Sequence, residues 1–240
     1  MNKSKIEWCD MTWNPVTGCL HGCDYCYARR IAERFGSVLK DDIEQYRGQI
    51  LHIADVKKHC PYPFIFEPTL HKYRLDEPIK KTKPQNIFVC SMADLFGKWV
   101  PDEWIQQVFD ACRQAKQHKY IFLTKNPDRY CSVYYQSPEH SSLGTTITCQ
   151  KDIDNIKNTT INYIDFLSIE PLKGEVNLER FVNSTLEWVI VGAQTGQGAK
   201  PPQKEWVLSI IDQCRDANVP VFLKNNINWH ERIQEYPEGV

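Results

Sequence analysis

Short apolar runs alternate with longer amphipathic segments through most of the chain, and this alternation constrains the fold more than any other feature. The runs are rich in β-branched and aromatic residues, which favour strands. Two intervening segments, 102–117 and 202–217, have helical spacing and open with proline and acidic residues, as helix starts do. The predicted strands lie in IFVCSMAD (87–94), YIFLTK (120–125), GTTITCQ (144–150), DFLSIEP (165–171), WVIVGAQ (188–194) and VPVFLKN (219–225).

Near-continuous apolar strands joined by helices are typical of a parallel sheet with right-handed crossover connections. A further strand near MTWNPVT (11–17) brings the total to about six or seven β/α units, close to the eight of a closed barrel. We therefore predict an α/β fold, an incomplete (β/α)6–7 barrel of parallel strands, as a single domain over residues 1–240. Residues 40–85 interrupt the pattern with proline and lysine, which predicts an insertion after the first helix.

The charge balance and the N-terminus narrow the class of protein. The chain has 29 Lys and Arg against 30 Asp and Glu, so it lacks the global basic field of a nucleic-acid coat protein. The first residues lack the apolar stretch of a signal peptide, and no run approaches the roughly 18 apolar residues of a membrane span. We therefore expect a cytoplasmic protein with no membrane partner, in which the ten cysteines do not form a disulfide framework.

Polar residues end five of the predicted strands. In a parallel array these ends gather at the carboxyl edge, where ligands bind. A strand that ends where solvent begins explains any one of them equally well. The five residues are Asp94, Lys125, Glu170, Gln194 and Lys224.

Three cysteines lie within eight residues, directly after the first predicted strand. Cys19, Cys23 and Cys26 form C-x3-C-x2-C, and Gly18 and Gly22 permit a tight wrap with backbone N–H groups toward sulfur. Three thiolates suit a soft metal.

Two kinds of metal site are compatible with this spacing. Zinc needs four protein ligands in a structural site, and His21 is the nearest fourth, although only Leu20 separates it from Cys19. An iron–sulfur cubane held by three cysteines leaves one iron without a protein ligand, and an open iron implies chemistry.

The motif, with Tyr25 as the aromatic residue between the last two cysteines, resembles that of the radical S-adenosylmethionine (SAM) superfamily. Over most of the chain the sequence is similar to the phage-associated three-cysteine-motif radical SAM-like proteins. The segments that carry this resemblance are IEWCDMTWNPVTGC, GCDYCYARR, FLTKNPDRY and the stretch from VGAQTG to FLK.

The resemblance implies a radical SAM enzyme. Cys19, Cys23 and Cys26 would hold a [4Fe–4S] cluster whose open iron is chelated by the amino and carboxylate groups of SAM. An electron from an external flavodoxin- or ferredoxin-type donor then cleaves SAM to methionine and a 5′-deoxyadenosyl radical, which abstracts a hydrogen atom. The alternative is a degenerate barrel that keeps a cluster or zinc for structure and acts as a binding partner.

The resemblance also suggests residues that bind SAM. Tyr25 would lie near the adenine, with Ser91 and Asp94 of SMAD (91–94) near the methionine amino group. Many superfamily members carry a Gly-Gly-Glu-Pro-like segment at that point, and this chain does not. The glycine-rich loop 191–201 would contact the nucleoside of SAM, and the alternative is that this loop is a plain turn. The candidates for these contacts are Gly192, Gln194 and Thr195.

Four further residues are candidates for catalysis. Lys125, Glu170 and Lys224 would position the substrate or bind the SAM carboxylate, unless two of them form a structural pair. Cys149 would donate a hydrogen atom to a substrate radical, and a small buried side chain is the alternative.

We predict a nucleic-acid substrate, with base repair or modification as the reaction, while peptide and small-metabolite substrates stay open. The basic residues of the insertion and its aromatic residues would combine phosphate attraction with base stacking, unless they are a solvated surface. The basic residues are His71, Lys72, Arg74, Lys80, Lys81 and Lys83, and the aromatic ones are Tyr62, Phe64, Phe66 and Tyr73.

Overall fold

The computed structural model describes residues 1–37, 50–57, 60–196 and 198–238. The chain forms two compact units, of which unit 1 comprises Met1–Phe122 and Gln136–Ser141, and unit 2 comprises Leu123–Tyr135 and Ser142–Val240. The expected single domain over residues 1–240 stays a prediction.

Unit 1 contains a mostly parallel set of strands. In spatial order they are β1 (Asn2–Lys3), β2 (Met11–Trp13), β6 (Asn86–Val89) and β7 (Lys119–Thr124). Only β1 pairs antiparallel, and the register places Trp13 opposite Val89 and Val89 opposite Phe122. Phe109 of α3 (Asp102–Gln114) packs with Phe96 and Phe122 in an aromatic core.

The predicted insertion folds back onto the strand that precedes the cysteines. Strands β3 (Val16–Thr17), β5 (Thr69–His71) and β4 (His52–Ala54) form a small sheet in that order, and η1 (Lys72–Arg74) follows β5. Residues 40–49 and 58–59 of the predicted insertion lie outside the described residues.

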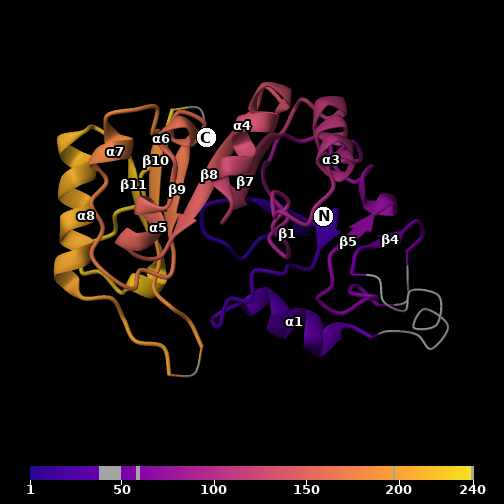
Figure 1. Ribbon diagram of the computed structural model, residues 1–240, viewed down its shortest axis with the longest axis horizontal. Coiled ribbons are helices and arrows are strands. Elements are labelled where there is room, and N and C mark those ends of the chain that lie inside the picture. Colours follow the sequence, from indigo (N-terminus) through magenta and orange to yellow (C-terminus); the bar gives the residue numbers. More distant parts are fainter. Residues whose placement is uncertain (38–49, 58–59, 197, 239–240) are drawn as a thin grey trace. The chain divides into compact units, whose positions relative to one another are not determined.

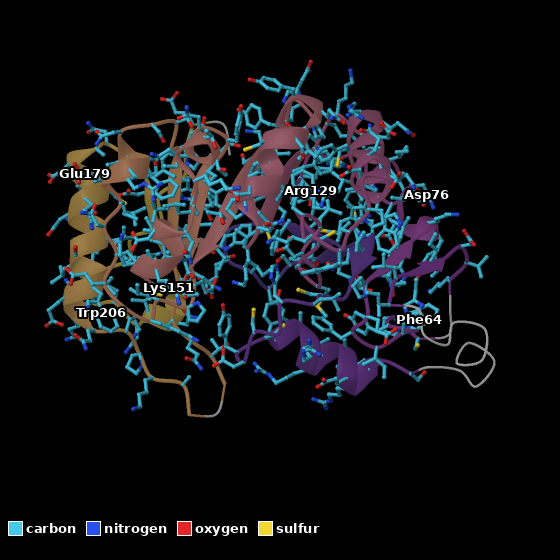
Figure 2. All side chains as sticks on the ribbon, viewed as in Figure 1. Phe64, Asp76, Arg129, Lys151, Glu179 and Trp206 are labelled. Carbon is cyan, nitrogen blue, oxygen red and sulfur yellow. The ribbon has the colours of Figure 1, made fainter. Side chains whose placement is uncertain are left out.

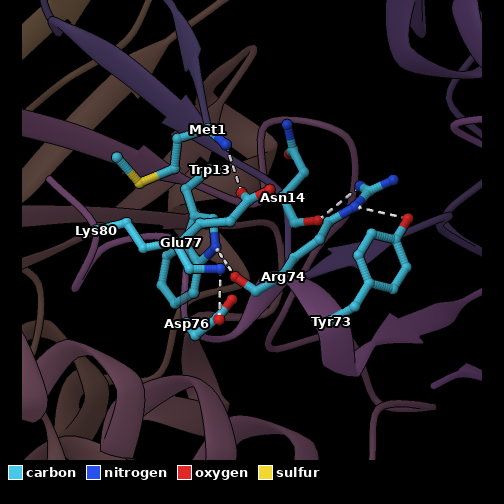
Figure 3. A network of polar contacts seen from close by, with 8 residues as sticks. All are labelled: Met1, Trp13, Asn14, Tyr73, Arg74, Asp76, Glu77 and Lys80. Carbon is cyan, nitrogen blue, oxygen red and sulfur yellow. Dashed lines mark hydrogen bonds and ion pairs between the residues drawn. The ribbon is translucent and has the colours of Figure 1, made fainter. Parts of the chain in front are cut away.

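Arg74 fixes the end of this segment to β2 (Figure 3). Its guanidinium donates hydrogen bonds to the Asn14 carbonyl at 2.9 Å, the Pro61 carbonyl at 2.8 Å and the Tyr73 hydroxyl at 3.2 Å. The indole N–H of Trp13 in turn donates to the Arg74 carbonyl at 2.9 Å. Because each guanidinium nitrogen has a partner, Arg74 acts here as a structural residue.

Unit 2 is built on four parallel strands, in the spatial order β8 (Ser141–Ile147), β9 (Phe166–Ile169), β10 (Trp188–Val191) and β11 (Val221–Leu223). Helix α8 (Lys204–Asp216) runs alongside them (Figure 1) and buries Val207, Ile210, Ile211 and Cys214. The apolar positions at helical spacing form its buried face, as binary patterning requires.

Shorter elements connect these strands. Helix α1 (Tyr27–Phe35) belongs to unit 1 and follows the cysteines directly. The remaining elements are η2 (Pro127–Arg129), α4 (Tyr130–Val133), η3 (Tyr134–Gln136), α5 (Gln150–Asp154), α6 (Asn158–Ile161), α7 (Glu179–Val182) and η4 (Asn225–Ile227).

The α/β class with mostly parallel strands is confirmed. Each of the six predicted runs overlaps a strand, and the two predicted helical segments contain α3 and α8. The incomplete barrel stays a prediction. Across the described ranges, no helix combines the length and apolar character needed to cross a membrane.

Candidate functional site

The segment 18–26, which we call the cysteine loop, begins where β3 ends and is tied to the loop after β6. Gly18 donates its N–H to the Met92 carbonyl at 2.9 Å and has a φ of 85°. A Cβ at this position would lie 2.2 Å from the Glu67 carbonyl oxygen. Only glycine fits this approach, so Gly18 fixes the direction in which the loop leaves the sheet.

All three cysteines of the loop are free thiols and half-buried. Cys19 and Cys26 pack against a small apolar cluster that includes Ala32, Phe66 and Met92. Cys26 is the N-cap of α1, and its sulfur accepts a hydrogen bond from the Arg29 backbone N–H at 3.3 Å. The start of α1 therefore positions the last cysteine.

Burial raises the pKa of the Cys19 thiol to about 12. The Asp94 carboxylate and the thiols of Cys23 and Cys26 raise it further, while a hydrogen bond from the His21 backbone N–H lowers it. Cys23 and Cys26 are thus within electrostatic range of Cys19. A bound cation would offset the burial and the repulsion that disfavour the thiolates.

Three cysteine thiols are the kind of donor set that iron–sulfur clusters use. Cys19 and Cys26 each accept a hydrogen bond from a backbone N–H, and hydrogen bonds of this kind tune the sulfur ligands of metal centres. Within the described part of the chain, no three His, Cys, Asp or Glu side chains are placed to hold one metal ion. In a cubane each cysteine binds a different iron, so its ligands lie farther apart than the ligands of one ion.

His21, between the first two cysteines, pairs with Asp94. Its Nε2 lies 2.7 Å from the Asp94 Oδ2, and its ring meets Trp99 edge-on at 4.8 Å between centroids. The second Asp94 oxygen accepts the Phe96 N–H at 3.0 Å. In this arrangement His21 does not offer Nε2 as a fourth zinc ligand, and the pair fastens the cysteine loop to the loop after β6.

The other unit 1 residues predicted to bind SAM lie around the same loop. Ser91 follows β6, and its carbonyl accepts a hydrogen bond from the Tyr27 hydroxyl at 2.7 Å. Asn14 Oδ1 accepts from the Ser91 hydroxyl at 3.2 Å and from the Met92 N–H at 2.9 Å. Tyr25 is half-buried within the loop. Sequence reasoning missed the role of Asn14, and only its place beside β2 suggests it.

Unit 2 brings together Glu170, Gly192 and Lys224, each the first residue after its strand. The register aligns Ile169 with Val191 and Val191 with Leu223, so the next residues are neighbours. Lys224 Nζ lies 2.5 Å from Glu170 Oε1, with side chains 16% and 27% exposed.

Gly192 leaves room for this ion pair. A Cβ on Gly192 would lie 2.7 Å from Glu170 Cδ and Oε1. The predicted pair between two of the three charged candidates therefore exists, at the carboxyl ends of β9 and β11. A structural ion pair and a substrate-binding pair are both compatible with this geometry.

Asn226 holds the loop after β10. Its side-chain oxygen accepts the Ala193 N–H at 3.1 Å and its nitrogen donates to the Ala193 carbonyl at 2.9 Å. Beyond this clamp, Gln194 is half-buried and Thr195 is exposed. Gln197 of the predicted loop lies outside the described residues. No sequence pattern singled out Asn226, which lies two residues beyond Lys224.

The remaining two candidates, Lys125 and Cys149, also follow strands, and both residues lie in unit 2. Lys125 comes directly after β7 and is half-buried. Cys149 is half-buried at the N-cap position of α5, two residues beyond β8. A Cβ on Gly174 would lie 3.6 Å from the Cys149 Cβ. Both therefore lie at the carboxyl ends of their strands, as predicted.

Several residues of the predicted nucleic-acid surface have structural roles. Phe64 (Figure 2) is buried and stacks on the His52 ring at 4.0 Å between centroids, and Phe66 is also buried. Lys72 pairs with Asp55 at 2.8 Å. Lys80 pairs with Asp76 at 2.5 Å, and Lys81 and Lys83 are exposed.

Comparison with known families gave one finding. The model of a family described as "Protein of unknown function (DUF5131)" matches residues 3–237. Comparison with curated proteins and with solved structures gave no match.

Proposed function

The chain belongs to the DUF5131 family, whose function is unknown, so we propose a function from its own residues: it is a radical SAM enzyme. The observation that carries this proposal is the cysteine loop, with three free, half-buried thiols positioned by Gly18 and by the start of α1. These thiols would hold a [4Fe–4S] cluster.

When bound, such a cluster supplies a low-potential electron and an open iron that binds SAM. The chain's own residues position this group. Backbone N–H groups donate to the sulfurs of Cys19 and Cys26, and the pair of His21 and Asp94 restrains the loop between them. Apolar contacts with Met92 exclude water from one side of the loop. Ser91 and Tyr25 are the proposed contacts for the methionine and adenine ends of SAM.

The proposed scaffold is an incomplete (β/α)6–7 barrel. Its support is the parallel pairing of β2, β6 and β7 in unit 1 and of β8, β9, β10 and β11 in unit 2. Ser91 and Asp94 of unit 1 follow β6, and Glu170, Gly192 and Lys224 of unit 2 follow β9, β10 and β11, at the carboxyl ends where α/β enzymes bind ligands.

The test is SAM cleavage. The anaerobically reconstituted protein, given dithionite and SAM, is expected to release 5′-deoxyadenosine, measured by chromatography and mass spectrometry. Cys23→Ala is the negative control because it removes one cluster ligand. A fully loaded cluster that releases no 5′-deoxyadenosine would contradict the proposal and favour a structural cluster in a binding protein. A colourless protein that retains zinc would favour the zinc alternative.

A nucleic-acid substrate is part of the proposal, and binding assays test it separately. Labelled single- and double-stranded DNA and RNA should bind weakly at low salt and lose affinity at moderate salt. Neutralising Lys72, Lys80 and Lys81 together should reduce this binding. Arg74 is left intact because its guanidinium holds the fold together. Absent binding at low salt, or unchanged binding by the variant, would favour a peptide or metabolite substrate.

A further inference from the structure

Helix α1 presents a stripe of large apolar side chains to solvent. Tyr27, Ile31 and Phe35 are 45%, 36% and 53% exposed. They are four residues apart, so at 3.6 residues per turn they follow one line along the helix. Ala28 and Ala32, on the adjoining side, are buried. A contiguous exposed apolar stripe of this kind is typical of an interaction surface.

Basic side chains line the outer edge of this stripe. Arg30 and Arg34 are exposed and lie four residues apart, on the side away from the buried alanines. The Arg34 guanidinium lies 5.2 Å from the Phe35 ring centroid. Arg29 turns inward, with its guanidinium 4.8 Å from the Phe66 ring centroid. The exposed stripe therefore has a positive edge, which complements an acidic partner.

The stripe begins directly at the cysteine loop. Cys26 is the N-cap of α1 and Tyr27 is the first helical residue. Ile31 lies five residues beyond Cys26, about 8 Å along the axis at 1.5 Å per residue. Because electron transfer slows steeply with distance, a protein docked on α1 would deliver electrons efficiently to a group held by this loop.

We propose that Tyr27, Arg30, Ile31, Arg34 and Phe35, the α1 surface, dock an acidic one-electron donor protein of the flavodoxin or ferredoxin type. The inference rests on the proposed function, because it requires a cluster in the cysteine loop. One electron passes from the donor's reduced centre, which is oxidised, to the oxidised cluster, which is reduced, and no atom is transferred. A small apolar patch with a charged edge suits such a transient complex.

The experiment compares two reductants on the same holoprotein. The probe is flavodoxin hydroquinone, and cluster bleaching is followed anaerobically by stopped-flow absorbance. Arg30→Glu/Arg34→Glu should reduce the second-order rate with flavodoxin roughly tenfold or more, since charge reversal removes electrostatic steering. Reduction by dithionite, which needs no docking surface, should be unchanged. The wild-type rate with flavodoxin should also fall as salt rises.

The matched control is Lys83→Glu/Lys116→Glu, which makes the same change in charge at two exposed lysines elsewhere in unit 1. It should keep the wild-type flavodoxin rate. If the arginine variant matches the wild type, or if dithionite reduces the wild-type cluster and flavodoxin does not, the docking surface is wrong while the proposed function stands. If no reducible cluster forms at all, the proposed function itself fails.

Discussion

The cysteine loop of unit 1 and the strand ends of unit 2 position polar groups by different means. The loop takes its shape from a glycine at positive φ, a helix cap and one long-range pair, His21 with Asp94. The ion pair of Glu170 and Lys224 follows from the register of three parallel strands. The conformation of the cysteine loop therefore depends on a few local residues, whereas the position of the ion pair is set by the register of the sheet.

The largest effect expected from this difference is on metal content. Reconstituted wild-type protein should bind about four irons per chain if the proposed [4Fe–4S] cluster is held by the loop. Replacing Cys19, Cys23 or Cys26 with alanine should abolish iron binding, as measured by iron and sulfide analysis. Cys9→Ala and Cys60→Ala are controls for thiols outside the loop. Full iron retention by Cys23→Ala would show that the loop is not the cluster site.

A smaller effect is expected where the sheet fixes the ion pair. Lys224→Met leaves the Glu170 carboxylate half-buried without its cation, and should lower the free energy of unfolding by about 2 kcal/mol. The double variant with Glu170→Gln should lose less than the sum of the single changes.

The control for this cycle is Lys80→Met, which breaks an exposed pair with Asp76 and should cost at most about 0.5 kcal/mol. Denaturant unfolding is measured for the wild type, the two single variants, the double variant and Lys80→Met. Equal losses in the free energy of unfolding for Lys224→Met and Lys80→Met would show that the pair of Glu170 and Lys224 stabilises the fold no more than an exposed pair does.

Gly192 tests whether the strand ends are as closely packed as the geometry indicates. Gly192→Ala places a Cβ 2.7 Å from the Glu170 carboxylate and should cost about 1 to 3 kcal/mol of stability. The cost should shrink in a Glu170→Ala background, where the obstructing group is gone. Gly174→Ala, whose Cβ would meet nothing closer than 3.6 Å, should unfold like the wild type. A penalty that persists without Glu170 would place the strain elsewhere.

The pH dependence of stability should have opposite signs in the two units. Burial, with Arg74 nearby, lowers the pKa of His71 in unit 1 to about 3, from 6.5. Between these values the unfolded state binds the extra proton, so unit 1 loses stability as pH falls from 6.5 towards 3, by up to about 1.4 kcal/mol per pH unit.

Burial raises the pKa of Asp165 in unit 2 from 3.8 to about 6. Here the folded state binds the extra proton. The contribution of Asp165 to the stability of unit 2 is therefore complete below pH 3.8 and is lost as pH rises through 6. Hydrogen exchange at pH 4 and pH 6, corrected for intrinsic rates, separates the units. Asp165→Asn should remove the effect in unit 2 alone. Protection that changes in the same direction in both units would contradict this account.

Much of the fold was predictable because its signals are local. β-Branched and aromatic runs predicted the strands from β6 to β11, and helical spacing predicted α3 and α8. The parallel order also predicted Glu170 and Lys224 at one edge, because residues that follow aligned strands are neighbours. Gly192, and not the predicted Gln194, directly follows β10 between them. Local pattern did not reveal the division into two units, which depends on the distribution of contacts along the whole chain.

The sequence by itself determined the thiol spacing, the strand and helix order and the polar strand ends, since each depends on residues close together in the chain. The tertiary structure decided which groups meet. His21 reaches Asp94 over 73 residues and Lys224 reaches Glu170 over 54, while Phe64 is buried and Arg74 is bound to backbone carbonyls. Such contacts depend on strand register and on the path of loops, and no short stretch of sequence specifies either.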